Sequence, residues 1–200
     1  MVGARPRIGV LALQGGVAEH ARLLDTLGAE VSLVRRPDDL PASDGIVLPG
    51  GESTTIDRLL KIFHVRDPLI QRLRSGLPVL GTCAGLILLA REVEDPAAGQ
   101  QTLGILDVTV RRNAFGPQVD SAEAQLSWGA TEHVRAAFIR APEVVRVGSD
   151  VEVTSTLSDA ALGQRIVGVR AASAIGISFH PELTGDATVH REFLRLCHRT

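Results

Sequence analysis

The first half of the chain alternates between short aliphatic runs and amphipathic segments. The aliphatic runs are the right length for buried parallel strands, and glycine or proline lies at their borders. In the segments between them, apolar side chains return every three to four residues, which predicts helices packed on a sheet. We therefore expect strands over 8–13, 31–34, 45–48 and 78–81, and helices over 18–27, 54–62 and 67–74.

The second half is mostly strand-like, and few helical stretches separate its apolar runs. A last amphipathic segment, 188–197, predicts a helix with its apolar side chains toward the core. The charged stretch 92–101 contains proline and glycine and is typical of an exposed loop. We expect further strands over 106–110, 125–126, 134–139, 151–155, 165–169 and 175–178.

This order of elements predicts an α/β fold. Strand and helix alternation favours a three-layer sandwich, with a mostly parallel central sheet flanked by helices. The later strands would extend it as antiparallel strands and make the sheet mixed. With 200 residues and no linker or repeat, the chain is expected to form one domain over 1–200.

The composition of the chain argues against several kinds of binding partner. The chain is 44% hydrophobic and 22% charged with a formal net charge of -2, so no overall charge attracts nucleic acid or an anionic membrane. No apolar run is long enough to span a bilayer, and the run at 8–13 is too short for a signal peptide. The two cysteines lack zinc-site spacing. We expect a cytoplasmic protein with no metal, no membrane contact and no nucleic-acid partner.

Cys83 has the sequence context of a nucleophile. It follows an apolar strand, precedes an apolar helix and lies between Gly81 and Gly85. Small residues at these offsets permit the sharp turn that exposes a nucleophile, and the Ala84 amide could then stabilise an oxyanion. The alternative is that Cys83 is only a small buried apolar residue at a strand-to-helix junction.

A base and an orienting carboxylate follow the strand at 175–178. Pro181 disfavours the helical conformation for His180, so we expect an extended segment that places His180 and Glu182 on the same side. Glu182 would then orient the imidazole and stabilise its protonated form. The alternative is a histidine that only caps a loop. The other histidines are expected on the surface or on helix faces, and His20 could lie at a partner interface: His20, His64, His133, His190 and His198.

The glycine-rich loop 48–55 lies between a predicted strand and a predicted helix. Its backbone N–H groups could provide a second oxyanion donor, at Gly51. It could equally be a helix start capped by Ser53 or Thr54 with Glu52 nearby. Arg112 and Arg140 are candidates for binding the carboxylate of an amino-acid substrate, although most arginines of this kind are only surface residues.

Taken together, these motifs resemble the class I, triad-type glutamine amidotransferases. Within that family, the chain is most similar to the glutaminase subunits of pyridoxal 5′-phosphate synthases. A departure is Ala114, where serine is common. The resemblance extends over nearly the whole chain through the segments 9–15, 48–55, 81–87, 112–116, 118–121, 138–142 and 178–184.

The resemblance implies a flavodoxin-like fold and the hydrolysis of L-glutamine to L-glutamate and ammonia through a thioester. Cys83 would be the nucleophile, His180 the general base and acid, and Glu182 the group that orients it. Gly51 and Ala84 would form the oxyanion hole, and no cofactor is implied. The residues implied to bind glutamine are Gly51, Glu52, Ser53, Arg112, Ile139 and Arg140.

The resemblance also implies a partner. The ammonia would pass to a barrel-shaped pyridoxal 5′-phosphate synthase subunit, within an assembly of twelve glutaminases and twelve synthase chains. The docking face would lie around the N-terminal strand and residues 14–20. Two other interpretations stay open: another enzyme of the same architecture, such as a cysteine peptidase or a glutaminase for a different synthase, and a non-catalytic binding subunit.

Overall fold

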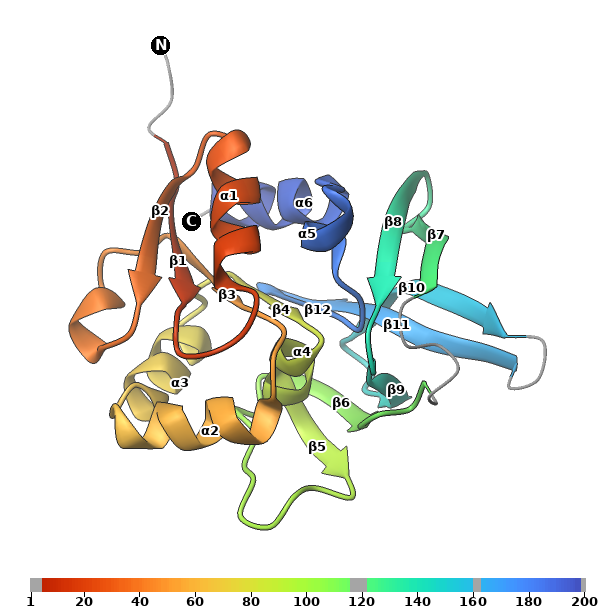
Figure 1. Cartoon of the computed structure of the whole chain (residues 1–200), viewed down its shortest axis with the longest axis horizontal. Helices are drawn as coiled ribbons and strands as arrows, with labels where there is room; N and C mark the ends of the chain where they lie inside the picture. Colours follow the sequence, from red (N-terminus) through yellow and green to blue (C-terminus); the bar gives the residue numbers. More distant parts are fainter. Residues whose placement is uncertain (1–4, 116–121, 160–162, 199–200) are drawn as a thin grey trace.

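A mixed sheet forms the centre of the molecule (Figure 1). The computed structural model describes residues 5–115, 122–159 and 163–198. Among these residues, the strand order is β2-β1-β3-β4-β12-β11-β9-β6-β5, with β10 paired to β11. The strands are β1 (Arg7–Leu11), β2 (Glu30–Val34), β3 (Gly45–Leu48), β4 (Val79–Thr82), β5 (Ala90–Glu94), β6 (Leu106–Arg111), β9 (Glu143–Val147), β10 (Glu152–Asp159), β11 (Gly163–Ala171) and β12 (Ala174–Ile177).

Helices cover both faces of the sheet, and a separate hairpin of β7 (Ala122–Trp128) and β8 (Glu132–Phe138) packs against the helices of one face. In Figure 1, α1, α5 and α6 lie on one side of the sheet, with α2 and α3 on the other. The helices are α1 (Val17–Thr26), α2 (Ser53–Ile62), α3 (Arg66–Arg74), α4 (Ala84–Leu89), α5 (Pro181–Thr184) and α6 (Thr188–Cys197), and a 3-10 turn spans Pro37–Asp39.

The alternating direction of strand side chains divides the interior into two cores. In β3, Ile46 and Leu48 join the core beneath α2, α3 and α4, whereas Val47 joins the core beneath α1 and α6. Burial on both faces explains why the central strands are continuously apolar rather than alternating. The helices contribute Leu60 and Leu69 on one side and Leu24 and Phe193 on the other.

The predicted fold class is confirmed. Strands β2, β1, β3, β4 and β12 are parallel, and β11 begins the antiparallel part of the sheet. Most predicted elements are present with ends shifted by one to a few residues. Of the part of the chain that the structure describes, no helix is long and apolar enough to cross a membrane.

Two predictions about elements were wrong, and one strand was not predicted. The expected loop at 92–101 begins inside β5, an edge strand that continues directly from α4. The strand β9 was not predicted, although its central valines are apolar. The expected extended segment after His180 is instead the start of α5, since Pro181 occupies the first helical position, where its missing N–H costs nothing. Residues 116 and 118–121 of the family-like motifs lie outside the described residues.

Candidate active site

A pocket of about 600 Å³ lies at the carboxyl ends of the parallel strands. Open α/β sheets place ligands at this edge, because several loops converge there. The loops after β1, β3, β4 and β12 all contribute. All the predicted site residues except Ala84 line the pocket, together with residues that were not predicted: Gln14, Gly15, Gly16, Glu19, Gly50, Ile87, Asn113 and Leu183.

Cys83 lies in a strained turn between β4 and α4. Its φ of 51° is in the left-handed region, which is uncommon for any residue other than glycine. The backbone N–H of Cys83 donates to the carbonyl of Ile177 at 2.8 Å and ties the turn to β12. A Cβ atom at Gly85 would lie only 2.1 Å from the carbonyl oxygen of Leu48, so glycine is required for the close approach. The turn therefore has the geometry of a nucleophile elbow.

His180 and Glu182 are joined by a short hydrogen bond. The Nδ1 atom of His180 lies 2.7 Å from Oε1 of Glu182, and both residues are buried. Burial alone would lower the pKa of His180, but hydrogen bonds with Cys83 and Glu182 outweigh that effect and raise the pKa to about 10. The imidazole thus lies between a thiol and a carboxylate, and this environment stabilises its protonated form.

The loop after β3 fixes the other side of the imidazole ring. A Cβ atom at Gly50 would lie 2.2 Å from Cε1 of His180, so the ring rests directly on the backbone there. The carbonyl of Gly50 also accepts a hydrogen bond from the N–H of Gly16 at 3.0 Å. This contact connects the loop after β1 to the loop after β3 and closes that side of the pocket.

Glu52 is the N-cap of α2, so the expectation of Ser53 or Thr54 as the cap was wrong. Its carboxylate accepts from the N–H groups of Thr54 at 3.1 Å and Thr55 at 2.7 Å. The N–H of Glu52 donates to Oε1 of Gln14 at 2.8 Å. Ser53 is the first residue of the helix and is buried at the pocket wall. The conformation of this loop therefore depends on the loop after β1.

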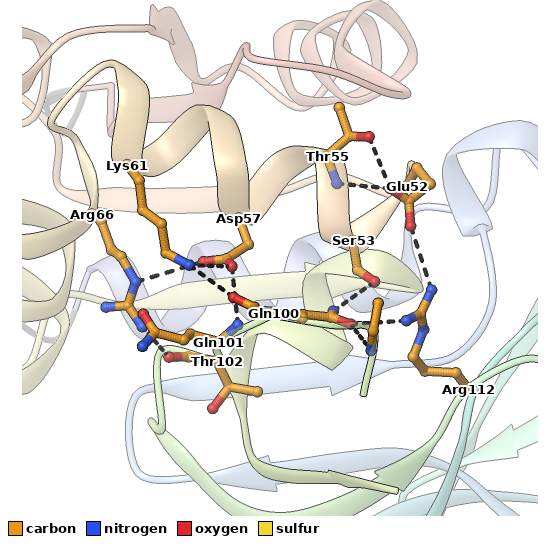
Figure 2. Close-up of polar contacts among 12 residues, drawn as sticks. Glu52, Ser53, Thr55, Asp57, Lys61, Arg66, Gln100, Gln101, Thr102 and Arg112 are labelled. Carbon is orange, nitrogen blue, oxygen red and sulfur yellow. Dashed lines mark hydrogen bonds and ion pairs between the residues drawn. The ribbon is translucent and has the colours of Figure 1, made fainter. Parts of the chain in front are cut away.

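Arg112 is held at the pocket by Gln100, as Figure 2 shows. Its Nη1 donates to Oε1 of Gln100 at 2.8 Å, and its Nη2 lies 3.4 Å from Oε1 of Glu52. Nε2 of Gln100 in turn donates to Oγ of Ser53 at 3.0 Å. Arg140, with a φ of 43°, and the half-exposed Ile139 line the opposite part of the pocket.

The segment that carries Gln100 is anchored by a buried carboxylate. Asp57 accepts from Lys61 at 2.7 Å and from the N–H of Gln101 at 2.9 Å, and its other oxygen lies 3.6 Å from Arg66 (Figure 2). Sequence reasoning missed Gln100 because its position in an apparent loop gave no chemical signal. One clue was Asp57, a charged residue within the predicted helix 54–62.

Two of the histidines expected on the surface or on helix faces lie on helix faces that are buried. His20 on α1 and His190 on α6 are fully buried, and Nδ1 of His20 lies 2.9 Å from Nε2 of His190. Burial lowers the pKa of His20 well below its usual value and that of His190 to about 4, so both rings are neutral near pH 7. Their polar pairing satisfies nitrogens that a purely apolar interior would leave without partners.

Comparison with known proteins gives one consistent result. The sequence profile of the SNO glutamine amidotransferase family matches residues 10–199. The chain is 55% identical over 193 residues to "Pyridoxal 5'-phosphate synthase subunit PdxT" of Cutibacterium acnes, covering 95% of this chain and 96% of the relative. It is 54% identical over 193 residues to the protein of that name in Nocardia farcinica, covering 96% and 85%.

Solved structures agree with this result. A crystal structure described as a glutamine amidotransferase aligns with a TM-score of 0.88 and 42% identity, covering 96% of this chain and 98% of that one. A chain from the structure of PurLQS from Thermotoga maritima shares only the fold, with a TM-score of 0.66 and 18% identity over 98% and 97% of the two chains.

Proposed function

Because the chain belongs to the SNO glutamine amidotransferase family, we propose that it releases ammonia from L-glutamine through Cys83, His180 and Glu182. The chain is a glutaminase subunit of pyridoxal 5′-phosphate synthase, and its ammonia supplies vitamin B6 synthesis. One observation carries the residue assignment: a cysteine in a strained turn shares a pocket with a buried imidazole hydrogen-bonded to a carboxylate.

The first chemical step is a proton transfer from the Cys83 thiol to His180. The pKa of about 10 at His180 supports this step, because the imidazole is basic enough to keep the proton near pH 7. The thiolate then attacks the amide carbon of glutamine. Backbone N–H groups of Gly51 and Ala84 stabilise the oxyanion, and in other enzymes one such donor contributes roughly 100-fold to 1000-fold in rate.

The second half of the reaction releases both products. His180 gives its proton to the leaving nitrogen, ammonia departs and a thioester remains on Cys83. Water then attacks the thioester with His180 as the base, and glutamate leaves. Glu182 keeps the ring oriented through both halves, since its bond to Nδ1 directs Nε2 toward the reacting groups.

Glutamine recognition requires groups for an α-carboxylate and an α-ammonium. Arg112 and Arg140 are the cations of the pocket for the carboxylate, and Glu52 is the anion beside them for the ammonium. Gly51, Ser53 and Ile139 complete the wall around the rest of the substrate. The closeness of Glu52 and Arg112 supports this arrangement. A free amino acid carries a carboxylate, which would pair with Arg112, and an ammonium group, which would pair with Glu52.

The enzyme acts together with a partner synthase chain, which the name of its relatives implies. We propose that this partner is barrel-shaped, that the assembly holds twelve copies of each chain, and that the complex is cytoplasmic. The whole chain would serve as one glutamine amidotransferase domain. Docking around β1 and residues 14–20 is supported by the contact of Gln14 with the N–H of Glu52, which connects that surface to the pocket loop.

The test is glutamate release from glutamine by the purified chain, alone and with a pyridoxal 5′-phosphate synthase subunit. We expect turnover that increases in the mixture and is lost in Cys83→Ala, because Cys83 is the only thiol among the described residues that line the pocket. The control is Cys197→Ala, whose buried thiol lies beside Phe193 on α6 and outside the pocket. Turnover that persists in Cys83→Ala would overturn the assignment.

A further inference from the structure

Behind the triad lies a buried polar chain for which the reaction above has no use. Nε2 of His20 lies 3.5 Å from Oε1 of Glu182, the oxygen that also bonds His180. The same Nε2 lies 3.1 Å from Oγ1 of Thr82, the residue directly before the nucleophile. His20 therefore contacts Glu182 of the triad and the residue that precedes Cys83. His190 lies on its far side.

The positions of the protons in this chain follow from the atoms that have partners. Among the described residues, Nδ1 of His190 is buried without a hydrogen-bond partner. A buried N–H without an acceptor is costly, whereas a bare ring nitrogen costs less, so the proton of His190 belongs on Nε2 and is donated to Nδ1 of His20. Neutral His20 must then carry its own proton on Nε2, facing Glu182 and Thr82.

Glu182 has few polar contacts among the described residues. Its Oε2 atom is buried without a partner in the part of the chain that the structure describes, so the carboxylate depends on donors at Oε1. His180 provides one of them. The reverse arrangement, with a lone pair of His20 facing Glu182, would place two electron-rich groups together in a buried site.

We propose that His20 is a positioning residue. Its Nε2–H, which is hydrogen-bonded to Thr82, also faces the Glu182 carboxylate 3.5 Å away and stabilises the orientation of Glu182 that supports His180. The inference rests on the proposed function and extends it, because it adds a fourth side chain that never touches the substrate. Removal of this N–H would loosen Glu182, and His180 would then lose part of the interaction that keeps it protonated.

Two substitutions distinguish the contribution of Nε2 of His20 from that of Nδ1. In His20→Gln, the amide nitrogen of glutamine lies near the position of Nε2 and keeps a donor toward Glu182. In His20→Asn, the side chain reaches only as far as Nδ1 and keeps the contact with His190 alone. His20→Leu removes both contacts. Each full-length variant is assayed with the synthase subunit for kcat and KM across pH.

We expect His20→Asn and His20→Leu to lose about tenfold in kcat with little change in KM, roughly the contribution of one hydrogen bond to a charged group. His20→Gln should stay within about threefold of the unchanged protein. The basic limb of the kcat/KM profile should move to lower pH in the Asn and Leu variants. Glu182 raises the pKa of His180, so a loosened Glu182 allows the imidazolium to lose its proton sooner.

Several titratable groups surround His180 and His20 and contribute to the pH profile. Glu182 and Cys83 face His180, while His190, His180 and Glu182 surround His20. Asp186 acts on His190. The Gln variant keeps a donor at the position of Nε2, which faces both Glu182 and Thr82, whereas the Asn variant does not. A shift in the Asn variant and not in the Gln variant therefore identifies a role of Nε2.

Leu24→Ala is the matched control, since Leu24 is fully buried on the same helix but lies outside the polar chain. We expect a lower Tm with kcat preserved. Normal kcat and an unshifted basic limb in His20→Asn and His20→Leu would overturn the proposal, as would equal losses in Asn and Gln. Absence of turnover in the unchanged protein would instead contradict the proposed function.

Discussion

Gly50 shows how strongly the site depends on one residue without a side chain. The imidazole of His180 occupies the space where a Cβ atom would be, at 2.2 Å from Cε1. Cys83 is the opposite case, since a side chain is present where the backbone favours glycine. Both positions follow from the need to bring a thiol and an imidazole together at one edge of the sheet.

We expect Gly50→Ala to lower kcat/KM at least 100-fold. The added methyl group must displace the His180 ring or the loop, and a displacement of about 1 Å from the reactive geometry costs roughly this much. Glutamate release with the synthase subunit measures it. The control is Gly129→Ala, where φ is 57° but no atom lies within 4 Å, so only stability should fall. Unchanged kcat/KM in Gly50→Ala would contradict the close packing of His180.

At the scale of elements, the N-terminal half of α2 supports the substrate pocket at two positions. Its N-terminus presents Glu52 and Ser53, and one turn later Asp57 anchors the segment that carries Gln100. Gln100 then holds Arg112 at Nη1, while Glu52 lies near Nη2 (Figure 2). The segment after β5 therefore supports the pocket wall through Gln100, although its residues do not line the pocket.

Gln100→Ala should raise the KM for glutamine about tenfold and leave kcat nearly unchanged. Arg112 loses a fixed partner, so it must be ordered when the substrate carboxylate binds, whereas the triad is untouched. Steady-state kinetics with varied glutamine separates the two constants. Arg91→Ala, which removes only an exposed ion pair with Asp107, should change neither. A fall in kcat without a change in KM would show that Gln100 acts elsewhere.

The sequence predicted elements well where burial is uniform and poorly where tertiary contacts decide. The central strands are apolar on both faces, so their identity was clear from composition alone. β5 was missed because an edge strand carries charged residues such as Arg91 and Glu92. The burial of His20 was not predicted, because it depends on His190, which lies 170 residues away. Glycine spacing predicted the strand-to-helix turn at Cys83, whereas nothing local marked Gln100.

At the scale of the whole molecule, the pair His20 and His190 joins α1 to α6 across one face of the sheet. Burial lowers the pKa of His190 to about 4, and it also lowers the pKa of His20. The unfolded chain takes up these protons near pH 6.5, the ordinary value for histidine, whereas the folded chain does so only at lower pH. The stability linked to this pair is therefore complete above about pH 6.5 and decreases as the pH falls.

We expect the free energy of unfolding to fall by about 3 kcal/mol through His190 alone between about pH 6.5 and 4, since each unit of pKa shift is worth about 1.4 kcal/mol. Denaturant unfolding at several pH values measures the slope. His190→Gln removes this titration, so its stability should depend less on pH over the same range. Equal slopes in both proteins would contradict the neutral, buried state of His190.

The pairing of His20 with His190 also bears on how the protein is made. During translation α1 is synthesised early, but His190 on α6, the partner of His20, is synthesised 170 residues later. The proposed base and orienting carboxylate, His180 and Glu182, are also made late, almost 100 residues after Cys83. The proposed triad is therefore incomplete during most of synthesis, and His20 gains its partner only when α6 is made.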